Sequence, residues 1–537
     1  MTPDASHRSR TRRRLVWIIV VLAIISFVAP KVWASARDFY TKLQVLSNIV
    51  SLARDVYVDE IDPGKLMDGA INGLFDELDP HSSYLAKDEA QRFTEKVQGS
   101  FGGVGIQYSV VEGVPTVIAT IEGGPAEYAG VRAGDQIVRV DGKTTIGWRS
   151  DDVQTHLRGP KGSRVSIAVS RAGVDEPIEI DIVRGDIPLL SIPYAFMLND
   201  SAAYVRITNF AATTGREFAT AMDSLDRIGM RYLVIDLRNN GGGDMDGAVA
   251  IANHFLSDGT TIVSQRGRWE PANQIIYASG GARKYDVPVV VLINHGSASA
   301  SEIVAGALQD TDRGIIVGQR SFGKGLVQRS FDLSSRVDGG GIVLLTVARY
   351  YTPTGRLIQR DYSAGTAQYI LDAMADGSSV DTTAQPAFAT PLGRIVYGGG
   401  GISPDYHTEA QSVDRAIVRL ANRSAFFRFA DDLARRNRII AETSEAYRVL
   451  EADDSLWSEF VDFAMASDTT FTDVDLERIR PDVTPYVLAG IAGRFQGPEA
   501  RYRLLVPIDA ELAEALHHLN DAAELLRAGN ARESRNE

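Results

Sequence analysis

Short apolar runs rich in β-branched residues alternate with helical stretches between residues 187 and 360, and this alternation constrains the fold more than any other feature of the chain. Runs of this kind suit buried strands, and the stretches between them suit helices that cover a sheet. The predicted fold class is therefore α/β, in layers. The apolar runs are Leu233–Leu237, Val289–Ile293, Ile315–Val317 and Ile342–Val347, and two of the helical stretches are Glu217–Arg227 and Ala300–Gln309.

The rest of the chain divides by its residue pattern. Apolar residues recur at helical spacing from Leu43 to Val58 and from Leu66 to Leu78, which predicts a helical N-terminal segment. Short alternating runs separated by glycine-rich turns then predict a small β-rich module, and the last part is acidic and reads as helical. The expected divisions are 1–36, 37–95, 96–186, 187–408 and 409–537.

Composition excludes several classes of function. Lys and Arg number 56 against 69 Asp and Glu, so the net charge of −13 repels phosphate backbones and argues against a nucleic-acid partner. The absence of cysteine removes disulfides, zinc-thiolate sites and cysteine nucleophiles together. We expect no metal and no cofactor.

The N-terminus carries an export pattern. Five arginines precede Leu15–Pro30, a stretch of apolar and small residues without any charge. Ala34-Ser35-Ala36 matches a small-residue cleavage site, so residues 1–36 are either a removed signal peptide or an uncleaved membrane anchor; a buried core helix is the remaining alternative. Both main readings predict an extracytoplasmic protein, in the periplasm or cell envelope.

The β-rich module opens with Gly103-Val104-Gly105-Ile106, whose glycines let consecutive N–H groups turn toward an anion such as a peptide carboxylate. The later string from Gly124 to Gly142, GPAxxAGVxxGDxIxxVDG, resembles the second half of a PDZ domain. PDZ domains bind C-terminal peptides by adding a strand to a sheet edge. The alternative is a bulge in an all-β core without a ligand.

Small residues in Asn294–Glu302 follow a buried strand and precede an apolar helix. A serine hydroxyl there would stand at a helix N-terminus, where the dipole and free N–H groups favour an alkoxide and an oxyanion. Ser299 and Glu302 also satisfy the S-x-x-E capping box, so a purely structural role stays open.

Ser321–Gln328 places a single lysine among glycines and apolar residues. Desolvation would lower the pKa of Lys324 from about 10.4, and a neutral amine can act as a general base. An exposed surface lysine is the alternative. Two rival motifs overlap here: most of a P-loop from Gly318, with Gly325 at its Ser/Thr position, and the S-x-x-K pattern that starts at Ser321.

The order of DPHSSYL, the PDZ-like module, DLRNNGGG, NHGSASASEIVAGALQD, SFGKGLVQ and ARYYTPTGR resembles the carboxyl-terminal processing proteases, the tail-specific S41 serine peptidases, over about residues 40–408. The resemblance implies an S41-type α/β catalytic core with an inserted PDZ domain, an N-terminal helical segment and a helical C-terminal extension. It makes Ser299 the nucleophile, Lys324 the general base and Gln328 the residue that positions the lysine, with a supporting role for Asp310.

The resemblance also implies an oxyanion hole. Its expected donors are the N–H groups of Ala300 and Gly242, although Gly241 stands where the family commonly has proline. A plain flexible turn is the alternative for this loop. A Ser-His-Asp arrangement using His295, His254 or His81 is disfavoured because the family needs no histidine.

The implied function is an extracytoplasmic serine endopeptidase that recognises protein C-terminal tails through the PDZ domain. The alternatives are a non-catalytic tail-binding receptor or scaffold and a non-peptidase acyl hydrolase. Expected partners are proteins or peptides with accessible C-termini, with an adaptor, a homo-oligomer or simple packing left open for the C-terminal helices. An apolar stripe there comprises Leu420, Phe426, Phe427, Phe429 and Leu433.

Overall fold

The computed structural model describes residues 38–111, 113–121, 123–337, 339–375, 385–409, 412–436, 454–468 and 470–536. These residues fall into two compact units, and the chain passes from the first to the second between Tyr84 and Leu85. The export pattern at residues 1–36 lies outside the described residues. Among the helices that are described, none is long and apolar enough to cross a membrane.

The first unit is helical, as predicted. A helix covers residues 38–56, and α2 (Pro63–Asp76) begins after Asp62, whose side chain accepts a hydrogen bond from the N–H of Gly64. Proline at the first helical position suits such a start because its missing N–H would have no partner there. β1 (Ser83–Leu85) follows at the boundary.

The predicted β-rich module is present in the second unit, after α3 (Lys87–Gln98). An antiparallel pair, β2 (Ser100–Gly103) and β9 (Gly185–Pro188), joins its two ends. Between them the strands pair in the order β3-β4-β5-β7-β8, and β6 pairs with β5. The bounds are β3 (Ile106–Val111), β4 (Val114–Thr120), α4 (Pro125–Tyr128), β5 (Gln136–Val140), β6 (Lys143–Thr144), α5 (Ser150–Leu157), β7 (Arg164–Ser170) and β8 (Ile178–Val183).

The predicted α/β core is built on a six-stranded sheet in the order β10-β11-β12-β15-β16-β21. β10 is antiparallel to β11, and the other neighbours are parallel. Parallel strands end at one edge of a sheet, which brings the loops that follow them together. The bounds are β10 (Tyr194–Met197), β11 (Ala202–Arg206), β12 (Tyr232–Asp236), β15 (Val289–Ile293), β16 (Ile315–Gly318) and β21 (Tyr406–His407).

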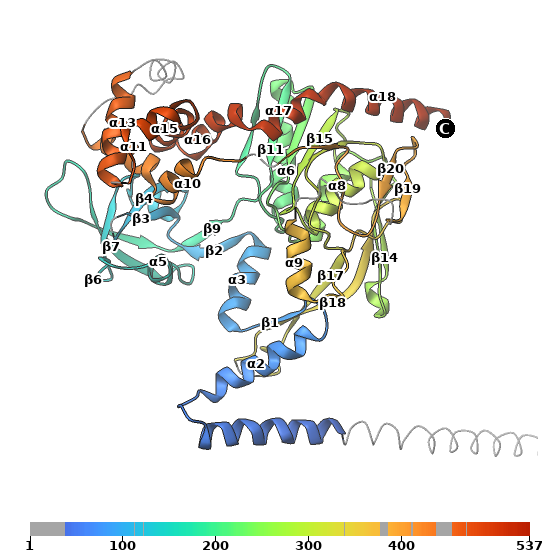
Figure 1. Ribbon diagram of the computed structural model, residues 1–537, viewed down its shortest axis with the longest axis horizontal. Coiled ribbons are helices and arrows are strands. Elements are labelled where there is room, and N and C mark those ends of the chain that lie inside the picture. The colour runs from blue at the N-terminus through green and yellow to red at the C-terminus, as the bar shows by residue number, and fades with distance from the viewer. Residues whose placement is uncertain are drawn as a thin grey trace, which may run out of the picture. The chain divides into compact units, whose positions relative to one another are not determined.

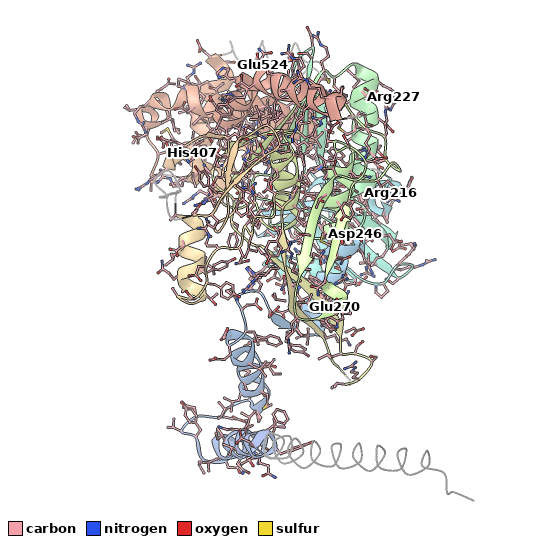
Figure 2. All side chains as sticks on the ribbon, turned by 90° about the vertical axis from the view of Figure 1, so that its right-hand side faces the viewer. Arg216, Arg227, Asp246, Glu270, His407 and Glu524 are labelled. Carbon is pink, nitrogen blue, oxygen red and sulfur yellow. The ribbon has the colours of Figure 1, made fainter. Side chains whose placement is uncertain are left out.

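Helices cover both faces of this sheet (Figure 1). Alternate residues of each strand face opposite sides, so Val289 and Val291 pack with α6 (Thr214–Ile228), α7 (Met245–Asn253) and α8 (Ala300–Asp310). Val290 and Leu292 pack instead against α17 (Ala510–His517) and α18 (Leu519–Asn536). Exposed charged side chains on the outer helices include Arg216, Arg227 and Glu524 (Figure 2). The last two helices of the C-terminal extension are therefore an outer layer of the core.

A second sheet lies beside the first and carries the lysine segment. Its strands pair in the order β14-β13-β18, with β17 on the other side of β18. The bounds are β13 (Thr261–Arg266), β14 (Gln274–Tyr277), β17 (Leu326–Asp332) and β18 (Ile342–Tyr351); α9 (Thr366–Met374) and the hairpin β19 (Ala387–Ala389) and β20 (Ile395–Tyr397) follow.

The rest of the C-terminal extension forms a helical bundle with a hydrophobic core of its own. The apolar stripe noted in the sequence lies in that core: Phe429 and Leu433 are 1% exposed, and Phe427 is half-buried. The stripe is therefore core packing. The helices of this bundle are α10 (Arg415–Asn422), α11 (Ala425–Arg435), α13 (Asp454–Ser467), α14 (Asp473–Arg478) and α15 (Arg480–Gln496). The next helix, α16 (Pro498–Leu505), packs its Tyr502 against the hydrophobic cluster of the six-stranded sheet.

Candidate active site

The serine turn joins β15 to α8, and Ser299 is the last residue before the helix. Ser299 has φ 56° and ψ −111°, a conformation that L-residues rarely adopt and that costs about 1–3 kcal/mol. A strained strand-to-helix turn of this kind exposes a serine hydroxyl above a helix N-terminus. The side chain is half-buried, whereas every residue of α8 is buried.

The lysine segment follows β16 and leads into β17. Lys324 Nζ donates a hydrogen bond of 2.7 Å to Gln328 Oε1. Both side chains are half-buried, so Lys324 is not an exposed surface lysine. Gln328 lies four residues after the lysine on β17, which begins at Leu326 and has a bulge between Val327 and Gln328.

Glu302 joins the serine turn to the lysine segment. Its Oε2 accepts hydrogen bonds from the N–H groups of Ser299 (2.8 Å) and Lys324 (2.9 Å). Its Oε1 accepts from Ser321 Oγ (2.6 Å) and the N–H of Gly323 (2.7 Å). The side chain is fully buried, and burial raises its pKa although these hydrogen bonds oppose the shift. One carboxylate therefore holds the backbone on both sides of the candidate site.

This contact also decides between the overlapping motifs of the lysine segment. A P-loop would offer the N–H groups of Gly323 and Lys324 to phosphate, but here both donate to Glu302. The S-x-x-K pattern needs a helix from Ser321 to Lys324, whereas these residues are irregular and Gly323 has φ 90°. Both rival interpretations are wrong for this structure.

The DLRNNGGG loop leaves β12 and lies against the serine turn. Asn240 O accepts hydrogen bonds from the N–H of Ala298 (3.0 Å) and from Ser301 Oγ (2.8 Å). Gly242 is closest to the serine: a Cβ atom built there would lie 2.8 Å from Ser299 Cβ and 2.9 Å from the nitrogen of Ala300. The position therefore admits only glycine.

The two expected oxyanion donors differ in their surroundings. The nitrogen of Ala300 is the first of α8, where N–H groups lack an acceptor within the helix. The N–H of Gly242 donates to Asn240 Oδ1 at 2.9 Å. Gly241 has open space around it. The assignment of Gly242 as a donor stays a prediction, and in this structure its N–H points to the Asn240 side chain.

Asp310 lies at the other end of α8 from Ser299 and is fully buried. Its Oδ1 lies 2.6 Å from the guanidinium of Arg356, and its Oδ2 accepts from Thr354 Oγ1 at 2.6 Å. These contacts tie α8 to the ARYYTPTGR segment. They give Asp310 a structural role at a distance from the serine.

The histidines have other partners. His295 Nδ1 lies 3.2 Å from Gln319 Oε1, and His254 Nδ1 lies 2.7 Å from the carbonyl oxygen of Arg283. Burial lowers the pKa of His254. His81 belongs to the first unit, and its N–H donates to Asp79. These contacts do not support a Ser-His-Asp arrangement.

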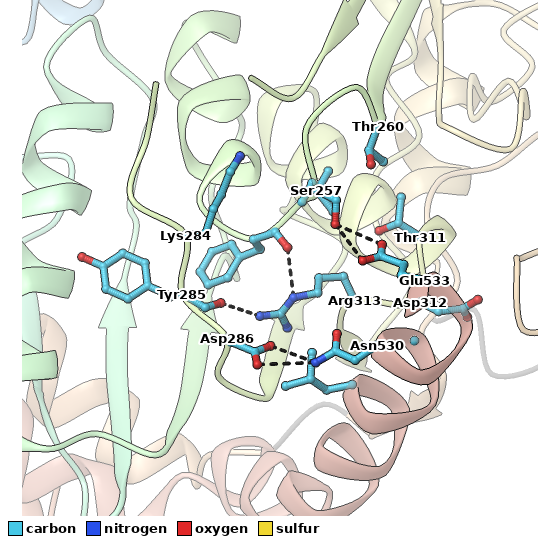
Figure 3. Close-up of a pocket in the computed structure, with 14 residues that line it drawn as sticks. Ser257, Thr260, Lys284, Tyr285, Asp286, Thr311, Asp312, Arg313, Asn530 and Glu533 are labelled. Atoms are coloured by element: carbon cyan, nitrogen blue, oxygen red, sulfur yellow. Dashed lines mark hydrogen bonds between the residues drawn. The ribbon is translucent and has the colours of Figure 1, made fainter. Parts of the chain in front are cut away.

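A cavity of about 170 Å³ lies elsewhere, between α18 and the loops around Arg313 (Figure 3). It contains neither Ser299 nor Lys324, and Asn530 and Glu533 of α18 reach into it. We place the candidate site at the serine turn because the candidate nucleophile Ser299 lies there and Glu302 joins that turn to Lys324. Among the described residues, no cluster of carboxylates and histidines has the form of a metal site.

Sequence reasoning missed part of this arrangement. The S-x-x-E spacing indicates Glu302 only as a helix cap, although the apolar and small residues that follow it, Ile303–Leu308, are a signal that this acid is buried and has further partners. Tyr350, whose hydroxyl donates to the carbonyl oxygen of Ser299 at 3.2 Å, had no local signal. Asn240 stands in the DLRNNGGG motif, which by itself does not indicate its contacts with the serine turn.

Three known families match parts of this chain. Peptidase family S41 matches residues 201–368, and the PDZ domain family matches residues 116–171. The family described as activating protease CtpB N-terminal domain matches residues 30–89. The S41 match includes the serine turn, the lysine segment and the DLRNNGGG loop.

Individual relatives carry related names. The carboxy-terminal-processing protease of Bartonella bacilliformis is 39% identical over 60% of this chain and 74% of its own length. The carboxy-terminal processing protease CtpA of Bacillus subtilis is 33% identical over 65% of this chain and 75% of its own. Among solved structures, the photosystem II D1 C-terminal processing protease is 28% identical over 68% of this chain and 92% of that chain, with a TM-score of 0.35. The chain therefore belongs to the carboxy-terminal-processing proteases, a PDZ-containing group of S41 serine-type peptidases.

Proposed function

We propose that the protein is an extracytoplasmic endopeptidase that captures protein C-terminal tails through its PDZ domain and cleaves them with Ser299 and Lys324. The observation that carries this proposal is the shared contact of Glu302, which holds the N–H groups of Ser299 and Lys324 on one carboxylate oxygen. Family membership favours a peptidase over a tail-binding receptor and over a non-peptidase acyl hydrolase.

The chemistry requires a neutral amine beside the serine hydroxyl. Ser299 Oγ attacks the scissile carbonyl carbon while Lys324 Nζ takes its proton, and the lysine then gives that proton to the leaving amine. Water hydrolyses the resulting ester by the same route. Gln328 Oε1 accepts from Lys324 Nζ and so directs the amine, which supports a positioning role for the glutamine.

The oxyanion formed in both steps needs N–H donors. The N–H of Ala300 stands at the start of α8, where the helix dipole favours negative charge. Gly242 lies against Ser299 and Ala300, which supports it as the second donor once its N–H exchanges Asn240 Oδ1 for the oxyanion. Asp310 supports the site only by anchoring α8.

We propose that the tail binds at the edge of the PDZ sheet formed by β3. β3 stands at one end of the strand order, so among the described strands it pairs with β4 on one side. A peptide could add to its other side, with the terminal carboxylate at Gly103, Val104, Gly105 and Ile106. The turn is shaped for close approach: Gly105 has φ 78°, and Gly103 to Gly105 are buried. Carboxylate binding by these residues is our proposal.

The extracytoplasmic location rests on the arginines and the apolar stretch Leu15–Pro30. A fusion of residues 1–60 to alkaline phosphatase, which folds only after export, tests it. Activity of the fusion in intact cells is expected, and loss of that activity when Ile18–Val21 is replaced by four aspartates is its control. An inactive fusion would refute export. Mass spectrometry of the purified chain distinguishes cleavage after Ala36 from an uncleaved anchor.

A timed digest tests the catalytic proposal. The substrate is an unfolded protein with an apolar C-terminus, and the enzymes are the full chain, Ser299→Ala and Lys324→Ala. We expect cleavage by the unsubstituted chain only, slowed when two aspartates cap the substrate tail. Cleavage by both variants would place the nucleophile elsewhere. Tail binding without cleavage by any form would favour the receptor, and preference for a small ester over the polypeptide would favour the acyl hydrolase.

A further inference from the structure

The N-terminus of α17 lies at the sheet edge from which the three catalytic segments emerge. Asp509 caps this helix by accepting from the N–H of Leu512, and Glu511 lies in its first turn. The helix packs against β15 and β16, and its Leu512 and Ala515 share a hydrophobic core with those strands. The end of the C-terminal extension is thus anchored close to the loops that carry the chemistry.

Both acids bind Arg238, the third residue of the DLRNNGGG loop. Arg238 Nη2 donates to Asp509 Oδ2 at 2.6 Å, and Nη1 donates to Asp509 Oδ1 at 2.9 Å and to Glu511 Oε2 at 2.5 Å. Arg238 Nη2 also donates a hydrogen bond of 2.7 Å to Asp236 Oδ2. The side chains of Arg238 and Glu511 are only 8% and 11% exposed, so solvent screens these pairs weakly.

Glu511 is also linked to the serine turn through Gln319. Its second oxygen, Oε1, accepts from Gln319 Nε2 at 3.0 Å, and Gln319 Oε1 lies 3.2 Å from His295 Nδ1. Gln319 directly follows β16 and precedes the lysine segment, whereas His295 lies in the serine turn. The Glu511 carboxylate therefore contacts the DLRNNGGG loop directly and, through Gln319, the serine turn; Gln319 also leads into the lysine segment.

The position of Arg238 matters because the next residues hold the candidate oxyanion loop. The N–H of Asn239 donates to Asn294 Oδ1 at 2.8 Å, and Asn240 binds the serine turn and the N–H of Gly242. Movement of Arg238 would therefore shift the chain that places Gly242 against Ser299. Misplacement of such a loop by about 1 Å can cost 100-fold in rate.

We propose that Asp509 and Glu511 are positioning residues of the peptidase, through which the C-terminal extension holds Arg238 and the oxyanion loop in place. The inference rests on the proposed function, since it concerns the same site. It gives the extension a role in catalysis within the same chain. The Tyr502 hydroxyl, 2.6 Å from that of Tyr204, which donates to Asp236, adds a second contact of the extension to the root of this loop.

The test compares Glu511→Ala with Asp521→Ala in the full chain. Asp521 is a matched control in the same extension: its carboxylate accepts from the Tyr406 hydroxyl at 3.0 Å and lies 2.7 Å from His518 Nδ1, and neither partner belongs to a catalytic segment. The readouts are kcat and KM on a tail peptide, the melting temperature, and the rate at which a fluorophosphonate labels Ser299, which depends on the oxyanion hole.

We expect Glu511→Ala to lower kcat and the labelling rate about 10- to 100-fold with KM nearly unchanged, and Asp521→Ala to change them less than twofold at a similar melting temperature. Glu511→Gln, which retains an acceptor for Arg238, should recover most of the activity. If Glu511→Ala does not fold, Glu511→Gln and Asp509→Asn replace it in the same assays. Each is then expected to lower kcat, by less than the loss predicted for Glu511→Ala.

Equal kcat losses in Glu511→Ala and Asp521→Ala, or a change in KM alone, would overturn the positioning role. Failure of the proposed function looks different. In that case Ser299→Ala would still cleave, or the unsubstituted chain would not be labelled at Ser299, whatever the state of Glu511.

Discussion

The carboxylate of Glu302 accepts a hydrogen bond of 2.8 Å from the N–H of Ser299, three residues before it. The same oxygen accepts from Lys324, so the strained turn that exposes the serine and the backbone of the lysine are held by one fully buried group. Four donors occupy all of the lone-pair sites of this carboxylate. Loss of its charge or of one oxygen would therefore leave a buried donor without an acceptor.

Glu302→Gln keeps the side-chain volume but replaces one acceptor oxygen with an NH₂ group. Whichever way the amide is turned, two N–H or O–H donors lose an acceptor, and each unmet buried donor costs about 1–3 kcal/mol. We expect kcat to fall at least tenfold and the free energy of unfolding to decrease. Steady-state kinetics and urea unfolding measure both. Glu217→Gln, which also removes a carboxylate bonded to backbone N–H groups of the core, is the control. Wild-type kcat in Glu302→Gln would contradict the role of the carboxylate.

Acidification should affect activity and stability in opposite directions through Glu302. Burial raises its pKa in the folded state, so the folded protein binds this proton more tightly than the unfolded chain, and stability increases as pH falls through the folded pKa toward the ordinary value of 4.5. Protonation also removes an acceptor from the site, so activity should fall over the same range, starting above the ordinary pKa of 4.5.

The measurement is a pH series of kcat/KM and of urea unfolding from pH 8 to pH 5. Relative to Glu302→Gln, the unsubstituted chain should gain more stability on acidification. A kcat/KM profile that is flat down to about pH 5 would count against both a titrating Glu302 and a neutral amine as the base.

Gly242→Ala tests the packing of the candidate oxyanion loop. Gly242 has φ 91°, and an added Cβ would lie 2.8 Å from Ser299 Cβ, so the loop must move away from the serine. We expect a loss of kcat of at least 100-fold with tail binding retained. Gly241→Ala is the matched control, because a Cβ there meets open space. Equal activity of Gly242→Ala and Gly241→Ala would show that the packing of Gly242 against Ser299 is not needed for catalysis.

Gln328→Met removes one acceptor of Lys324 Nζ, Gln328 Oε1, while preserving the length of the side chain. Because Gln328 is half-buried on a strand, the melting temperature should change little, whereas kcat should fall about tenfold as the amine loses its orientation. Ser330→Ala, an exposed change two residues along the same strand, should behave as the unsubstituted chain does. A variant with altered KM and intact kcat would show that Gln328 binds substrate instead.

Asp310→Asn should act on stability. Asp310 and Arg356 form an ion pair in which both side chains are 0% exposed, and removing one charge leaves the other buried without its partner. The expected loss is about 3–5 kcal/mol in the free energy of unfolding. The double variant Asp310→Leu with Arg356→Leu should recover part of it. If Asp310→Asn lowers kcat in a chain of unchanged stability, the residue acts in catalysis.

Much of the fold could be predicted from the chain alone. Runs such as Val289–Ile293 indicate buried strands because their period and composition are local properties, and the order of strands and helices then indicates the α/β class. The serine turn and the lysine segment were predicted as candidate sites for the same reason. Glu302 is predicted only as a helix cap, because the S-x-x-E spacing indicates its bond to Ser299. Its bonds to Ser321, Gly323 and Lys324 join segments about twenty residues apart, which no local spacing indicates.

The short segments are encoded locally: the buried strand, the serine turn, the apolar helix and the glycine-flanked lysine each have a recognisable pattern in the chain. Which of these segments meet, and the strain at Ser299, depend on the tertiary packing. Arg238 and Asp509 are 271 positions apart, and Gly242 faces Ser299 only because parallel strands end at one sheet edge. Contacts of this kind depend on how buried faces pack, and side-chain spacing along the chain carries no record of that packing.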